Sequence, residues 1–159
     1  MSAARNAFLL ASLLAAGVAH TADPAPSAIE TLLEQTAERR SALVAHEGKG
    51  FSYRSYGSNE LLYAVGDLDG DGRPEIAARL VYFMGVGSYD LVDIFADRGN
   101  GYEQVDFINL YNVGLEDKVE SLMIRDGLLH IETIGIERGK KLSKSGAFRW
   151  PMSEPSNRK

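Results

Sequence analysis

The acidic run 66–75 is the sequence feature that most constrains how this chain can fold. Its sequence is GDLDGDGRPE, in which aspartates alternate with other residues and glycines interrupt the run. Glycine adopts backbone conformations that other residues resist, so the chain can turn sharply here. Carboxylates at alternate positions of a short loop are the arrangement that a hard cation prefers. The sequence therefore predicts a tight loop that binds a cation.

The residues of this loop match ligand positions 1, 3, 5, 7 and 9 of a calcium-binding loop. The predicted ligands are three aspartate side chains, one backbone carbonyl and a carboxylate acting directly or through water: Asp67, Asp69, Asp71, Arg73 and Glu75. Ala78 stands at position 12, where an EF-hand has Glu, so an EF-hand is disfavoured. A ligand set made only of oxygen atoms favours Ca²⁺ over Zn²⁺ or Cu²⁺.

The alternative interpretation of the loop is a solvated acidic turn without an ion. Four carboxylates lie within nine residues, and like charges held close together are costly without a counter-ion. This repulsion favours the metal-bound interpretation. Extracellular calcium modules bind at about 10⁻⁴–10⁻³ M, an affinity that suits a structural ion better than a sensor.

The first residues of the chain have the pattern of a secretory signal peptide. Arg5 precedes a short apolar run at 7–18, and small residues then offer a cleavage site after Ala19. We therefore predict a signal peptide at 1–19, with cleavage after Ala22 as the alternative. The apolar run is too short for a stable membrane-spanning helix.

Length and composition predict one domain after this leader. The 159 residues suffice for a single hydrophobic core and are too few for two. We predict a linker at 20–27, a single domain at 28–152 that contains the loop 67–75, and a flexible tail at 153–159.

The charge and cysteine content limit the classes of partner and the cellular location. Residues 1–19 hold one basic residue and no acidic one, so the mature chain keeps 16 basic and 22 acidic residues, a net charge of −6. An acidic chain without a basic cluster argues against nucleic acid as a partner. The chain has no Cys and, after the leader, no apolar run long enough to span a membrane. We expect a periplasmic or secreted protein.

Apolar residues recur at helical spacing early in the predicted domain. They predict a helix over 28–46 that ends before Gly48 and lies against a sheet. Ser27 and Glu30 have the spacing of a capping box, which satisfies free amides at a helix start. Charged residues on the opposite face are expected to point to solvent: Glu34, Glu38, Arg39 and Arg40.

From Phe51 onward the hydrophobic period changes to two, which indicates strands. Asp126-Gly127 between two alternating segments predicts a hairpin. The short turns favour an α+β fold, with one N-terminal helix packed on a mainly antiparallel β-sheet. The alternative is a mostly-β fold, blade-like or a small barrel. The predicted strands cover 61–65, 76–84 (with both faces covered), 89–96, 102–108, 118–124, 128–136 and 147–150.

The segment VGDLDGDGRPEI, residues 65–76, resembles the calcium loop of VCBS and FG-GAP repeats. In that family the Asp-rich loop joins two strands, and the repeats stack as blades of a propeller. The motif occurs once here, whereas a propeller needs several blades. The resemblance therefore implies a calcium loop between strands and no propeller. The chain is also similar to small exported bacterial proteins of unassigned function.

These observations lead to an expectation about function. We predict an exported, non-enzymatic domain that is stabilised by Ca²⁺ and acts by binding a protein or a glycan. Two alternatives remain: a metal-dependent hydrolase that uses the acidic loop, and a structural envelope protein whose acidic turn holds no ion. The hydrolase lacks a second group of residues to serve as acid, base or nucleophile.

Overall fold

The structure is a computed structural model that describes residues 23–48, 50–56 and 60–151. The predicted signal peptide and the predicted tail lie outside these residues. Among the described residues, no helix combines the length and the apolar character needed to cross a membrane. The elements are α1 (Pro26–Val44), the 3-10 helix η1 (Ala45–Glu47), β1 (Phe51–Arg54), β2 (Tyr63–Gly66), β3 (Glu75–Met84), β4 (Ser88–Asp97), β5 (Tyr102–Asn109), the 3-10 helix η3 (Tyr111–Val113), β6 (Lys118–Arg125), β7 (Leu128–Glu137) and β8 (Lys140–Arg149).

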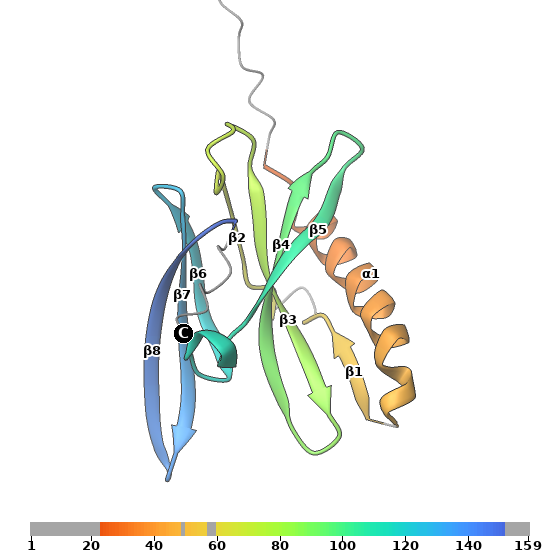
Figure 1. The fold of residues 1–159 in the computed structure, drawn as a ribbon, viewed down its shortest axis with the longest axis vertical. Coiled ribbons are helices and arrows are strands. Elements are labelled where there is room, and N and C mark those ends of the chain that lie inside the picture. The colour runs from red at the N-terminus through yellow and green to blue at the C-terminus, as the bar shows by residue number, and fades with distance from the viewer. Residues whose placement is uncertain (1–22, 49, 57–59, 152–159) are drawn as a thin grey trace, which may run out of the picture.

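Three layers make up the fold, with the larger sheet in the middle (Figure 1). We call this sheet, which contains β1 to β5, sheet A, and the sheet of β6, β7 and β8 sheet B. The helix α1 buries its apolar stripe on one face of sheet A, where Leu33 packs with Leu80 and Phe95. Sheet B covers the other face, where Ile131 packs with Val92. The predicted α+β fold, a helix on an antiparallel sheet, is confirmed.

The strand β3 organises sheet A. On one edge it pairs first with β2, through residues 75–78, and then with β1, through residues 81–84. On its other edge it pairs with β4, which in turn pairs with β5, and all these pairings are antiparallel. Seven of the ten residues of β3 are buried. This burial confirms the prediction that both faces of the strand are covered.

The start of α1 differs from the sequence prediction. The helix begins at Pro26, inside the predicted linker 20–27, with Ala25 as its N-cap and no side-chain cap. Proline fits the first helical position because its missing N–H would have no partner there. Ser27 therefore lies within the helix, and its carbonyl accepts a hydrogen bond from the Thr31 hydroxyl. The predicted capping box of Ser27 and Glu30 is wrong.

Sheet B contains the predicted hairpin and a longer last strand than expected. Asp126 and Gly127 have φ angles of 54° and 68°, as a two-residue turn with Asp-Gly requires. The final strand, predicted over 147–150, is β8 and spans ten residues. It is an edge strand whose residues are mostly exposed and polar. Its hydrophobic alternation is therefore weak, and the periodicity of the sequence underestimates its length.

One fully buried carboxylate of β4 faces the helix. Asp93 has no exposed surface, and its Oδ1 lies 2.7 Å from Nη2 of Arg40. The Gln104 amide also donates to Oδ1, at 3.1 Å. Arg40, expected to face solvent, is instead 12% exposed and lies over the rings of Tyr53 and Phe107. The prediction for Arg40 is wrong because a buried acid turns this residue inward.

A second fully buried carboxylate of β4 faces sheet B. Asp90 accepts hydrogen bonds from the Tyr56 hydroxyl at 3.0 Å and from the Val119 N–H at 2.8 Å. The ammonium group of Lys118 lies 3.4 Å from Oδ1 of Asp90, and the Arg79 guanidinium lies 4.0 Å from Oδ2. Burial and the neighbouring Asp90 charge raise the pKa of Tyr56 to about 12, so its hydroxyl stays protonated as a donor.

The ion pair between Arg40 and Asp93 gives a first prediction. Replacing Arg40 by Met leaves the Asp93 charge buried without its partner and is expected to lower the free energy of unfolding by about 3–5 kcal/mol. The matched control is Arg39→Met, whose guanidinium is exposed, with an expected cost of about 1 kcal/mol or less. Urea unfolding measures the loss of stability in both variants. Equal losses would contradict a stabilising role for the ion pair between Arg40 and Asp93.

The raised pKa of Asp93 predicts how the stability of the fold depends on pH. Burial raises its pKa from 3.8 to about 6, although Arg40 opposes this rise. Between pH 4 and 6 the native state therefore holds a proton that the unfolded chain releases, so this group makes stability fall as the pH rises. The change amounts to at most about 3 kcal/mol. Urea unfolding at several pH values between 4 and 6 should show that the free energy of unfolding falls more steeply with rising pH in wild type than in Asp93→Asn. Parallel curves for the two proteins would refute this role of Asp93.

Candidate metal site in the loop between β2 and β3

The acidic loop leaves sheet A at the end of β2 and returns at the start of β3. Gly70 and Gly72 have φ angles of 83° and 84°, in the left-handed region that side chains with a Cβ rarely adopt. Neither glycine has a neighbouring atom where a Cβ would stand. The backbone conformation, and not crowding, therefore requires glycine at these two positions.

The backbone amides of the loop orient its aspartate carboxylates. Oδ1 of Asp67 accepts the Gly70 N–H at 2.6 Å, and its Oδ2 accepts the Gly72 N–H at 3.0 Å. Asp69 accepts the N–H of Asp71 at 2.9 Å. These short-range bonds are typical of aspartate in turns, and here they hold successive side chains toward one centre.

Three predicted ligands meet in space. One carboxylate oxygen from each of Asp67, Asp69 and Asp71 lies within 4.8 Å of the others. Calcium–oxygen bonds measure about 2.3–2.6 Å, so two oxygens on one ion can be that far apart. Asp69 and Asp71 are exposed, and Asp67 is partly exposed. The donor set and its spacing fit a hard divalent cation.

The side chain of Arg73 compensates part of this negative charge. Its Nε and Nη2 donate to Oδ2 of Asp71 at 2.9 and 2.6 Å, and its backbone N–H donates to Oδ1 at 2.8 Å. These hydrogen bonds lower the pKa of Asp71. Sequence reasoning assigned only the backbone carbonyl of Arg73 to the site and missed this internal counter-ion.

Glu75 lies apart from the group of three aspartates. Its side chain is buried, with the residue 2% exposed, and its Oε2 accepts the N–H of Leu68 at 2.7 Å. Burial is the main cause that raises the pKa of Glu75, and the nearby charges of Asp69 and Asp71 add to it. The carboxylate thus fixes the base of the loop to the core, because Leu68 is itself a core residue.

The turn between β4 and β5 also contains an aspartate that binds backbone N–H groups. Oδ1 of Asp97 accepts the N–H groups of Gly99 and Gly101 at 2.8 and 3.3 Å. Within the described part of the chain, the only group of three or more potential metal-ligating side chains at this spacing is that of Asp67, Asp69 and Asp71.

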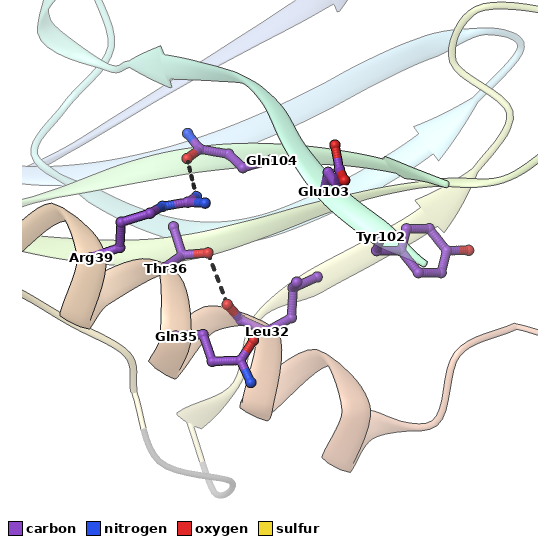
Figure 2. Close-up of a pocket in the computed structure, with 7 residues that line it drawn as sticks. All are labelled: Leu32, Gln35, Thr36, Arg39, Tyr102, Glu103 and Gln104. Carbon is purple, nitrogen blue, oxygen red and sulfur yellow. Dashed lines mark hydrogen bonds between the residues drawn. The ribbon is translucent and has the colours of Figure 1, made fainter. Parts of the chain in front are cut away.

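Sequence reasoning also missed a hollow between α1 and β5, with a volume of about 360 Å³ (Figure 2). Residues from one face of α1 and three successive residues of β5 line it: Leu32, Gln35, Thr36, Arg39, Tyr102, Glu103 and Gln104. A local sequence pattern does not predict such a site, because its two walls, α1 and β5, are distant in the sequence. The buried Asp93 is visible in the sequence as a charged residue between apolar residues of β4, where a charge is rarely buried without a partner.

Comparisons with models of known protein families, with curated proteins and with solved structures found no match for this chain. The resemblance to the VCBS and FG-GAP calcium loop therefore rests on the residues of the loop alone.

The contact between Glu75 and Leu68 yields a further prediction. Glu75→Ala removes a buried acceptor and leaves the Leu68 N–H unpaired, which is expected to cost about 1–3 kcal/mol of unfolding free energy. Glu75→Gln keeps an acceptor oxygen at this position and should cost clearly less. Chemical unfolding in the presence of chelator compares the two variants. Equal losses would mean that the charge of Glu75, and not its hydrogen bond, is what the loop requires.

Proposed function

We propose that this protein is an exported, non-enzymatic binding domain in which Asp67, Asp69 and Asp71 hold a structural Ca²⁺. The observation that carries the proposal is the convergence of three aspartate oxygens within 4.8 Å of one another. Each oxygen comes from a loop whose shape is already set by hydrogen bonds to its own backbone. A calcium ion adds further contacts from carbonyl oxygens and water to reach six to eight ligands.

The charge of the cluster supports a divalent ion. Three carboxylates face one counter-charge, the guanidinium of Arg73, which leaves two negative charges to be balanced. Asp71 meets this guanidinium with Oδ2, so an entering cation competes with Arg73 for one ligand. This competition agrees with the weak affinity, about 10⁻⁴–10⁻³ M, that calcium modules outside cells have.

A structural role suits the position of the loop better than a catalytic one. Hydrolysis needs a general acid, base or nucleophile beside the metal. Among the described residues, the side chain that hydrogen-bonds to these aspartates is that of Arg73, a permanent cation. The loop closes the connection between β2 and β3, and an ion there ties the ends of two core strands together. The partner that we propose for the domain is a protein or a glycan.

Calcium is expected to stabilise the protein against heat. At a concentration ten times the dissociation constant, an ion that binds only the folded state adds about 1.4 kcal/mol, which raises Tm by about 4 °C for a domain of this size. Asp69→Asn removes one charge and keeps an acceptor for the Asp71 N–H. It should abolish the rise in Tm, which differential scanning calorimetry with Ca²⁺, Mg²⁺ or chelator measures.

Two further variants make this experiment decisive. Asp126→Asn removes the same charge at the remote hairpin, where the side chain is 82% exposed, and should keep the full response to calcium. Arg73→Gln removes the competing cation and should tighten calcium binding several-fold. An unchanged Tm at about 10 mM calcium in wild type and in Arg73→Gln would refute the metal site and favour the acidic turn without an ion. A metal-dependent hydrolytic rate lost in Asp69→Asn would favour the hydrolase.

A further inference from the structure

A continuous groove runs along α1 beside β5. The hollow shown in Figure 2 has a volume of about 360 Å³, and a second one of about 200 Å³ adjoins it toward the start of the helix. The two share Leu32, Gln35 and Tyr102 as lining residues. From Ala28 to Arg39 the groove follows about 16 Å of the helix, at 1.5 Å per residue. It is separate from the acidic loop and does not depend on a bound metal.

The end of the groove near the helix start is apolar. Its lining includes Pro24, Ala28, Ile29, Leu32 and Ile76. Ile29 and Ile76 belong to the core and form the floor, whereas Ala28 is exposed at the rim. A surface of this kind gains stability when an apolar chain covers it and removes it from water.

The other end of the groove presents a positioned cation. The guanidinium of Arg39 donates to Oε1 of Gln104 at 3.2 Å, and the Gln104 amide nitrogen donates to the buried Asp93. When ionised, Asp93 only accepts hydrogen bonds, so it sets which way the Gln104 amide faces, and Gln104 in turn holds Arg39 beside the hollow (Figure 2). The carboxylate of Glu103 points away from α1 in the same view. The remaining donors of Arg39 suit a carboxylate.

We propose that this groove binds a fatty acid, with its alkyl chain on the apolar end and its carboxylate on Arg39. The apolar floor and the cation lie in line along one groove, which matches the two parts of such a molecule. The amide of Gln35, between them on the wall of both hollows, offers a second donor to the carboxylate.

An alkyl chain fits this groove better than a peptide. A peptide needs partners for its own N–H and C=O groups when it leaves water, and the helix wall has none to offer because its backbone is bonded internally. The edge of β5 is irregular, since the ladder to β4 shifts register between Ile94 and Phe95. The N–H of Phe107 is already taken by the Asp106 side chain. An alkyl chain makes no such demand.

The test is isothermal titration calorimetry of the purified protein with saturated fatty acids of six to twelve carbons. Each fatty acid is kept below the concentration at which it forms micelles. Affinity is expected to rise about three- to fourfold per added methylene until the apolar end is full. Decanol, which lacks the charge, should bind at least about tenfold more weakly than decanoate. Decanoate should shift the amide resonances of residues 28–39 and 102–104 in NMR spectra.

Three variants identify the two ends of the groove. Arg39→Gln should weaken decanoate binding about tenfold or more and leave decanol unchanged. Arg125→Gln removes the same charge at the β6–β7 hairpin and should have no effect. Ala28→Phe fills the apolar end from the exposed rim and should remove the dependence on chain length. Equal affinity for decanoate and decanol, equal loss in the two arginine variants, or no saturable binding would each overturn the proposal. Chelator is present throughout, so failure here is independent of the calcium site.

Discussion

Two carboxylates buried on opposite faces of β4 hold the three layers of this fold together. Asp93 binds Arg40 of the helix, and Asp90 binds groups from β6 and from the segment after β1. Burying a charge is costly unless it is paired, so each aspartate requires its partner layer to be in place. Apolar contacts supply most of the driving force, whereas these pairs determine where the helix and sheet B sit on sheet A.

One of these two aspartates, Asp93, also connects the core to the surface. Asp93 lies beneath the groove between α1 and β5 and orients it through Gln104. Glu75 has a comparable role at the acidic loop, where a buried carboxylate holds the Leu68 N–H. In both places a surface feature is positioned by an acid that is itself out of contact with solvent. Positioned groups of this kind bind ligands more tightly than free ones, because less side-chain freedom is lost on binding.

Local patterns predicted most elements of this fold, and a long-range partner accounts for the error at Arg40. Alternation over 76–84 predicted β3, and Asp126-Gly127 predicted the β6–β7 hairpin. Helical periodicity placed Arg40 outside because its partner Asp93 lies 53 residues further along the chain. The ligand pattern included Glu75, yet as the first residue of β3 it faces the core. The loop spacing alone brought three of the five predicted residues together.

Hydrogen bonds to backbone N–H groups set the shape of the acidic loop. Backbone N–H groups hold the side chains of Asp67, Asp69 and Asp71. The guanidinium of Arg73 pairs with Asp71 and supplies part of the positive charge that an ion would provide. In the calcium complex that we propose, the backbone would already hold the carboxylates, so binding would require only that one guanidinium leave and that water be shed. Exchange of the ion would then be fast, and occupancy would follow the surrounding concentration without delay.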